Sequence, residues 1–169
     1  MHQLRHVHCV CYSYSAAELQ AIGYRTEELR AVGVSLADLH VAGASAVDLR
    51  SAGISATGLK AEGISLAEIK AAGYSIKELK LAGFSPQEMR SAQFAASELT
   101  AAGFTAKELK AGGYTTAEEL REAGCSVSEL RLGGFHAKEL RLGGFSAEEL
   151  AAGGFTASQL RGGGFSASE

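Results

Sequence analysis

The sequence predicts an all-α solenoid of about fifteen short helices, each about two turns long. Three observations lead to this prediction: one decapeptide recurs from Tyr14 onward, every copy carries the signals that start a helix, and nearly every copy ends in glycine. The stretch AAGFTAKELK, residues 101–110, is representative. We therefore expect a non-repeat segment over residues 1–13 and a single repeat solenoid over residues 14–169.

Five positions of the decapeptide F-S-A-K-E-L-K-A-A-G vary little. Position two is Ser or Thr in thirteen of sixteen copies, position five is acidic in thirteen of fifteen, position six is Leu in thirteen of fifteen, and position ten is Gly in fourteen of fifteen. Position one is apolar and mostly aromatic from Tyr74 onward. Its members are Tyr14, Tyr24, Val34, Ala44, Ile54, Ile64, Tyr74, Phe84, Phe94, Phe104, Tyr114, Cys125, Phe135, Phe145, Phe155 and Phe165.

Each recurrent residue has a task in a short helix. The hydroxyl at position two is an N-cap, and the acid three residues later completes a capping box. The apolar residue at position one and Leu at position six form a hydrophobic staple, while Gly at position ten is the left-handed residue of a Schellman stop. Lys or Arg at position seven suits the negative end of the helix dipole. In the one eleven-residue copy, Tyr114–Gly124, we expect Thr116 to be the cap and Glu119 to restore the box, with the extra residue in the turn.

A two-turn helix is too short to persist alone, so stacking between repeats must stabilise the array. We expect positions one, three, six, eight and nine to fill the core, and positions four, five and seven to face water. The copies that end in Gly-Gly, such as those at Gly143 and Gly153, are expected to fray more readily.

The alternative fold is a right-handed β-solenoid. The stretch ADLHVAGASAVDLRSAGISATGL, residues 37–59, resembles the pentapeptide-repeat family, whose fold would turn Leu39, Ala44, Leu49, Ile54 and Leu59 inward. The resemblance implies a regulatory, DNA-mimicking protein. Elsewhere the same register would bury charges, for example those of Glu27, Lys77 and Lys107, at a high free-energy cost.

The N-terminal segment HQLRHVHCVC gathers the residues most able to bind a metal. Imidazole and thiolate are ligands that Zn²⁺ and Cu⁺ prefer, and short His/Cys tracts bind metals. The spacing matches no zinc finger or knuckle, so a short apolar capping strand or a flexible leader stays an alternative interpretation. The candidate ligands are His2, His6, His8, Cys9 and Cys11.

The sequence predicts neither a catalytic nor a cofactor-binding residue. Cys125 stands at an apolar position one and is expected to be buried, while His40 and His136 are expected to be solvated. The hydroxyls at position two have no recurrent His/Asp partners, and no phosphate-binding glycine motif occurs. We therefore do not expect an enzyme.

The charge pattern narrows the class of partner. Net charge is −3, and basic residues are interspersed with acids along the repeats, whereas a nucleic-acid reader needs a basic face. No apolar run is long enough for a membrane span, and the start lacks the apolar core of a signal peptide. The three cysteines are an odd number and none recurs with the repeat, which favours a reducing, intracellular compartment.

The sequence favours a non-catalytic scaffold or accessory subunit with an extended surface for protein partners, and no small-molecule substrate. A β-solenoid regulator, a metal-binding protein, and a protein that meets a periodic polymer, ice or mineral surface remain the alternatives.

Overall fold

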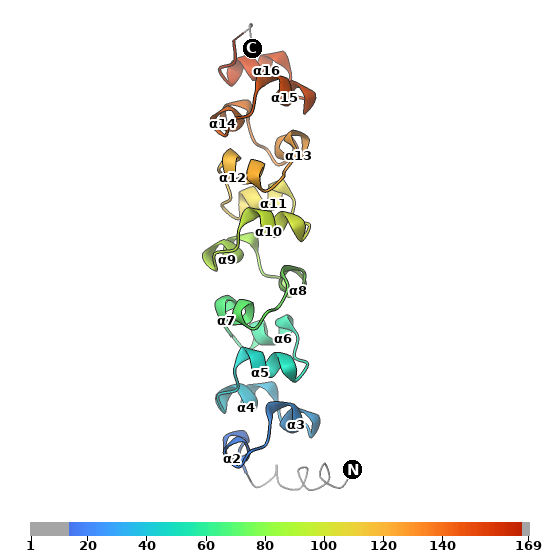
Figure 1. Ribbon diagram of the computed structural model, residues 1–169, viewed down its shortest axis with the longest axis vertical. Coiled ribbons are helices and arrows are strands. Elements are labelled where there is room, and N and C mark those ends of the chain that lie inside the picture. Colours follow the sequence, from blue (N-terminus) through green and yellow to red (C-terminus); the bar gives the residue numbers. More distant parts are fainter. Residues whose placement is uncertain (1–13, 167–169) are drawn as a thin grey trace. The chain divides into compact units, whose positions relative to one another are not determined.

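The computed structural model describes residues 14–166, and all regular secondary structure in that range is helical (Figure 1). Fifteen six-residue helices follow one another at a spacing of one decapeptide. They are α2 (Ala16–Ala21), α3 (Thr26–Ala31), α4 (Leu36–Val41), α5 (Ala46–Ser51), α6 (Ala56–Ala61), α7 (Leu66–Ala71), α8 (Ile76–Leu81), α9 (Pro86–Ser91), α10 (Ala96–Ala101), α11 (Ala106–Ala111), α12 (Ala117–Glu122), α13 (Val127–Leu132), α14 (Ala137–Leu142), α15 (Ala147–Ala152) and α16 (Ala157–Gly162).

This result confirms the all-α prediction, and the β-solenoid alternative is wrong. The stretch that resembles pentapeptide repeats, residues 37–59, lies in α4, α5 and α6 and the turns between them. The physical reason is that a β-solenoid would place charged side chains inward in other copies, whereas the helix places Glu27, Lys77 and Lys107 on its exposed face.

The chain forms two compact units, residues 1–83 and residues 84–169. Within each unit, a helix packs chiefly on the second helix after it. In the first unit α2 packs on α4, α3 on α5, α5 on α7 and α6 on α8; in the second, α9, α11, α13 and α15 pack in one series and α10, α12, α14 and α16 in another. Successive helices therefore lie on alternate sides, as Figure 1 shows for α2 and α3 and for α13 and α14, and two decapeptides make one coil.

Every described helix begins where the repeat pattern predicts. At α13 the Glu129 N–H donates to Ser126 Oγ at 3.3 Å, and the Ser126 N–H donates to the Glu129 carboxylate at 2.7 Å. This reciprocal pair satisfies two backbone donors that a helix start leaves without an intrahelical partner. The hydroxyl accepts the cap hydrogen bond at Ser15, Ser35, Ser45, Ser55, Ser65, Ser75, Ser85, Thr105, Ser126, Ser146 and Thr156.

At four helices no hydroxyl accepts the capping hydrogen bond. Arg25, Ala95 and His136 have no capping hydroxyl, yet the acid three residues later still accepts the N-cap N–H, at 2.9, 2.8 and 2.6 Å. Thr116 is the N-cap of α12 as predicted, and the extra residue lies in the turn. The predicted capping bond to the backbone is wrong, however, because the Thr116 hydroxyl donates to the Glu119 carboxylate at 3.2 Å instead.

The helices end in Schellman turns. After α14 the Gly144 N–H donates to the Arg141 carbonyl at 3.0 Å, and the Phe145 N–H donates to the Leu140 carbonyl at 3.1 Å. Gly144 has φ +81°, a left-handed conformation that favours glycine. Gln93 adopts the same conformation, with φ +57°, at the one copy that lacks Gly at position ten.

The core consists of positions one and six together with several alanines at position three, such as Ala56, Ala96 and Ala106. The position-six side chains from Leu19 to Leu150 are fully buried, and the position-one side chains from Ala44 onward are buried too. Position eight was predicted to join this core, and that prediction is wrong: Val41 is 88% exposed, Leu81 85% and Leu142 83%. Position eight follows the buried Leu by two residues, which at about 100° per residue turns it to the opposite side of the helix.

The Gly-Gly pairs of the second unit were expected to make the helix ends fray. The structure shows that the first glycine of each pair also has a packing role. A Cβ on Gly143, the C-cap of α14, would lie 2.4 Å from the Ala117 Cβ and 2.7 Å from the Ala117 carbonyl carbon. Equivalent contacts occur between Gly112 and Pro86 and between Gly153 and Val127. Because glycine has no side chain at position nine, the end of one helix can approach the start of the helix two before it in the chain.

We expect Gly143→Ala to lower the free energy of unfolding by about 1–3 kcal/mol, because the added methyl group must displace backbone. Gly162→Ala is the matched control, since Gly162 lies in α16 with no atom within 4 Å of an added Cβ. That variant should be neutral or more stable by about 0.5–1 kcal/mol. Urea unfolding followed by circular dichroism at 222 nm gives both values. Equal stability of the two variants would contradict the packing role.

The capping boxes make the fold sensitive to acid. The hydroxyl and backbone N–H of Ser126 lower the pKa of Glu129, and Ser65 and Ser75 act in the same way on Glu68 and Glu78. A carboxyl whose folded pKa lies below its unfolded value contributes stability above the unfolded pKa and loses it as pH falls toward the folded value.

The thermal midpoint should therefore fall progressively as pH is lowered from about 6 to about 3, through the ordinary range of glutamate. Circular dichroism melts at 222 nm measure this. In about 1 M salt, where the screening length is only about 3 Å, the fall should persist, because capping bonds act at contact distance. Disappearance of the fall in salt would instead assign it to general charge repulsion.

Candidate interaction surfaces

A basic side chain at position seven recurrently reaches the end of the second helix after its own. Lys110 on α11 donates from Nζ to the Gly134 carbonyl, after α13, at 2.7 Å. Such bonds satisfy carbonyls that helix ends leave without a partner, in trans rather than within one helix. The other pairs are Arg50 with Ala72, Lys60 with Gly83, Arg121 with Gly144, Arg131 with Gly153 and Arg141 with Gly164.

Cations at position seven also lie over the aromatic residue that follows the glycine. The Lys110 Nζ is 4.1 Å from the centre of the Phe135 ring, a favourable cation–π distance. Comparable pairs, with the guanidinium carbon 4.8–5.3 Å from the ring centre, are Arg50 with Tyr74, Arg90 with Tyr114, Arg121 with Phe145 and Arg141 with Phe165. Positions seven, ten and one of different repeats thus form one recurring contact.

Lys110 also carries an ion pair. Its Nζ lies 3.3 Å from the Glu139 carboxylate of α14. Burial raises the pKa of Glu139, but the His136 backbone N–H and Lys110 outweigh it, so that the pKa of this carboxyl is lowered overall. A second pair joins Arg121 and Glu149, also at 3.3 Å. Lys110 and Arg121 are therefore engaged in contacts between repeats and are not free to recognise an anionic ligand.

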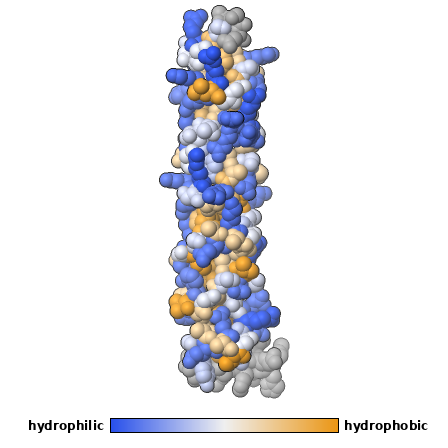
Figure 2. Space-filling model, turned by 60° about the vertical axis from the view of Figure 1, so that its left-hand side comes forward, coloured by the Kyte–Doolittle hydropathy of each residue, from blue (hydrophilic) through white to orange (hydrophobic). Residues whose placement is uncertain are grey.

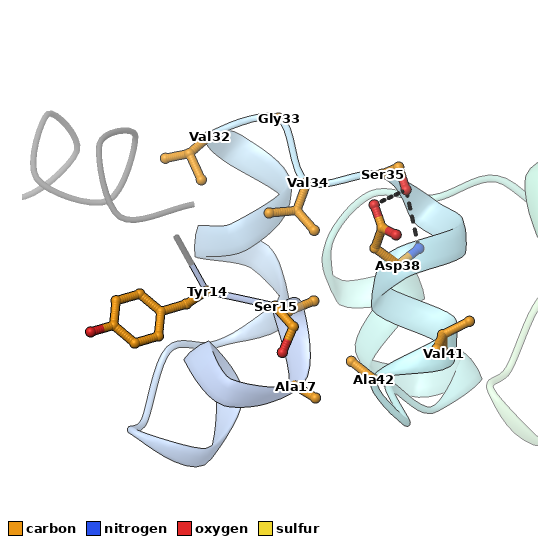
Figure 3. A pocket seen from close by; sticks show the side chains of 11 residues that line it. Tyr14, Ser15, Ala17, Val32, Gly33, Val34, Ser35, Asp38, Val41 and Ala42 are labelled. Atoms are coloured by element: carbon orange, nitrogen blue, oxygen red, sulfur yellow. Dashed lines mark hydrogen bonds between the residues drawn. The ribbon is translucent and has the colours of Figure 1, made fainter. Parts of the chain in front are cut away.

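A surface hollow of the first unit lies between α2 and α4 (Figure 3). Its volume is about 630 Å³, and its lining includes Ala17, Val32, Val34 and Val41. Val34 occupies the position that holds a large aromatic ring in most of the second unit. The Tyr14 ring is 53% exposed and points away from Val34 in Figure 3. A smaller side chain therefore leaves an apolar recess at the surface.

We call Ala17, Val32, Val34, Val41 and Ala42 the α2–α4 face. Ala17 and Val41 are exposed, Val32, Val34 and Ala42 are half-buried, and none of the five is charged. On the equivalent outer positions of α12 the chain carries Glu118 and Glu122. Elsewhere, apolar groups are interspersed with hydrophilic ones, as the view in Figure 2 shows. The α2–α4 face therefore differs from the charged repeats by composition and by shape.

The predicted metal ligands His2, His6, His8, Cys9 and Cys11 lie outside the described residues, so the metal site stays a prediction. Within residues 14–166, no three His, Cys, Asp or Glu side chains are grouped to hold a metal ion. In that same range no helix has the length and apolar character needed to cross a membrane.

The other residues singled out by sequence have ordinary surroundings. Cys125 is buried and 3.8 Å from the Thr100 hydroxyl, and burial raises the pKa of its thiol, which disfavours the nucleophilic thiolate. His40 and His136 are exposed, the latter as the N-cap of α14. The cross-repeat role of position seven was missed by sequence reasoning, because the residues that it joins stand 22–24 positions apart.

Lys110→Met should lower the free energy of unfolding by about 1–2 kcal/mol, because it removes a charged hydrogen bond, an ion pair and a cation–π contact while keeping the apolar stem. Lys107→Met changes an exposed lysine of the same helix and should stay within about 0.5 kcal/mol of the unmodified chain. Urea unfolding compares the two. A similar small effect of both variants would show that the cross-repeat contact contributes little.

Comparison with known proteins agrees with the repeat geometry. The sequence model of the protein family described as decapeptide repeat region matches this chain three times, over residues 13–85, 63–118 and 115–169. No curated protein and no solved structure matches the chain. The three family matches follow one another along nearly the whole length, so the chain belongs to the decapeptide repeat family.

Proposed function

We propose that this chain is a non-catalytic scaffold or accessory subunit that presents a repeat surface to protein partners. The observation that carries the proposal is the α2–α4 face, an uncharged recess in which three valines lie together at the surface. Exposed apolar recesses on soluble domains mark sites of contact with other proteins. A protein partner would cover Val32, Val34 and Val41.

The assignment of the polar side chains supports a structural role. The acids at position five cap their own helices, as Glu129 does at Ser126. The cations at position seven bind carbonyls two helices away, as Lys110 does at Gly134. Catalysis requires a nucleophile or an acid–base pair that lies in a cleft and is not engaged in structural hydrogen bonds. The acids at position five and the cations at position seven that make these bonds are instead used to hold the array together.

Val41→Glu tests the surface, because a buried charge opposite an apolar partner is strongly unfavourable. Val41 is 88% exposed, so the variant should fold like the unmodified chain. Leu81→Glu in α8 of the same unit, 85% exposed in the unmodified chain, is the matched control. We expect tagged chain and Leu81→Glu to co-purify the same protein, and Val41→Glu to lose it.

Circular dichroism establishes that both variants are folded before the comparison. Retention of the partner by Val41→Glu would remove the α2–α4 face from the proposal. A chain that recovers no stoichiometric partner from extracts of its native cells by cross-linking and mass spectrometry would contradict the scaffold function itself.

A further inference from the structure

The cross-repeat contact of Lys110 has three parts. Its ammonium group lies over the Phe135 ring, donates to the Gly134 carbonyl and pairs with the Glu139 carboxylate. Arg121 makes the same three kinds of contact with the corresponding residues one repeat later. A ring, a carbonyl and a carboxylate in this arrangement therefore form a site for an organic cation, which the chain fills with its own side chain.

One copy of this contact in the first unit lacks both the cation and the ring. Gln20 occupies position seven there, and it carries no charge. Its amide donates to the Thr26 hydroxyl at 3.2 Å. Ala44 has only a methyl group at the position that holds the ring in the contact of Lys110. The residues that correspond to the carbonyl, the ring and the carboxylate are Gly43, Ala44 and Asp48.

A pocket lies where these two groups are missing. Its volume is about 380 Å³, and we call it the α2–α5 pocket. The half-buried Tyr24 adds an aromatic side chain to its lining. Among residues 14–166, no hydrogen bond reaches the Gly43 carbonyl and no ion pair reaches the Asp48 carboxylate. The lining includes Gln20, Tyr24, Thr26, Gly43, Ala44 and Asp48.

A copy in the second unit shows how the chain itself closes such a gap. Thr100 and Cys125 replace the cation and the ring there, and the Thr100 hydroxyl lies 3.8 Å from the Cys125 sulfur. The two smaller side chains thus contact each other. In the first unit Gln20 is bonded to Thr26 instead, and the pocket remains beside Ala44. The α2–α5 pocket is therefore open to a group from outside the chain.

The charges around the pocket favour a cation over an anion. Two carboxylates, those of Glu27 and Asp48, line it, together with one guanidinium, that of Arg25. The Arg25 guanidinium lies 3.8 Å from the Glu27 carboxylate, so its charge is already paired. Asp48 accepts the Ser45 N–H through Oδ2 at 3.0 Å, and the Ser45 hydroxyl donates to the same oxygen, which leaves Oδ1 for a ligand.

We propose that the α2–α5 pocket binds an organic cation in which an ammonium or guanidinium group is joined to an aromatic ring. The ring takes the place of the side chain missing at Ala44, and the cation binds the Gly43 carbonyl and Asp48 Oδ1. In the filled site Lys110 Nζ lies 4.1 Å from the ring centre, a separation that a short alkyl linker spans. The pocket shares no lining residue with the α2–α4 face, so this inference stands independently of the proposed function.

The test titrates the full chain with phenethylammonium and follows the backbone amide resonances by NMR. Saturable binding with a Kd of about 1 mM or below is expected, as is usual for a ligand of so few atoms. The largest shifts should fall on Ala44 and Asp48. Phenethyl alcohol has the same ring without the charge, and it should bind at least about ten-fold more weakly, because it lacks the charged hydrogen bonds.

A second probe identifies the source of the cation. The capped dipeptide amide of phenylalanine and arginine carries the same two groups on a peptide backbone. Tighter binding of the dipeptide assigns the pocket to side chains of a protein partner. Tighter binding of phenethylammonium assigns it to a free amine.

Variants of the chain locate the site. Gln20→Lys supplies the cation from within, as Lys110 does in its own copy, and should weaken phenethylammonium binding at least about ten-fold without loss of stability. Asp48→Asn keeps an acceptor for Ser45 but removes the charge, and should weaken binding about ten-fold. Asp38→Asn changes the corresponding acid of α4, which lies outside the pocket lining, and should bind like the unmodified chain.

Circular dichroism at 222 nm establishes that each variant is folded. The proposal is overturned by the absence of saturable binding up to about 10 mM, by equal binding of phenethyl alcohol, or by binding that neither Gln20→Lys nor Asp48→Asn weakens. An equal loss of binding in Asp38→Asn and Asp48→Asn would also overturn it, because the loss would then come from weakened helix capping rather than from the pocket.

Discussion

The structure depends on one turn that ends a helix and begins the next within three residues. Glycine takes the left-handed conformation at position ten, the apolar residue follows, and the hydroxyl at position two caps the next helix. The residue between them is both the last residue of one Schellman stop and the start of the next staple. Because this turn recurs every ten residues, no helix reaches a length at which it would be stable alone. Tertiary packing must therefore provide what helix length does not.

So many helix ends create a second constraint. Each six-residue helix leaves about four N–H groups and four carbonyls without intrahelical partners, which is more than half of its backbone polar groups. The N–H groups are served locally by the hydroxyl and the acid of the same repeat, as at Ser126 and Glu129. The carbonyls are served partly by the Schellman bonds and partly from another coil, as by Lys110 at Gly134. Local capping thus fixes each helix, while capping in trans fixes the register between coils.

This division explains how far the sequence could predict the structure. The helices, their caps and their stops depend on residues within about five positions of each other, and all of these were predicted, apart from the cap bond of Thr116, whose hydroxyl turns to Glu119. The packing of each helix on the second one after it depends on contacts some twenty residues apart, which a strict period of ten cannot distinguish from other stacking schemes. Position eight was misplaced for a different reason: apolar residues such as Val41 and Leu142 suggested burial, although the helix period places them about 200° from the buried Leu at position six. The α2–α4 recess follows from that stacking direction, and so lay beyond sequence reasoning.

Departures from the repeat are the most informative residues for function, because the repeated residues solve the same structural problem in every copy. Two kinds of departure occur. Gln93 replaces glycine at position ten, and Val32 occupies position nine, where the repeat of α15 has Gly153. Gln93 adopts a left-handed backbone that the turn demands, so the fold tolerates it at a conformational cost of about 1 kcal/mol. Val32 and Val34, by contrast, place branched apolar groups beside a hollow where the fold gains little burial from them. Val34 thus keeps an apolar side chain at a core position without the burial that the aromatic rings of the second unit have there.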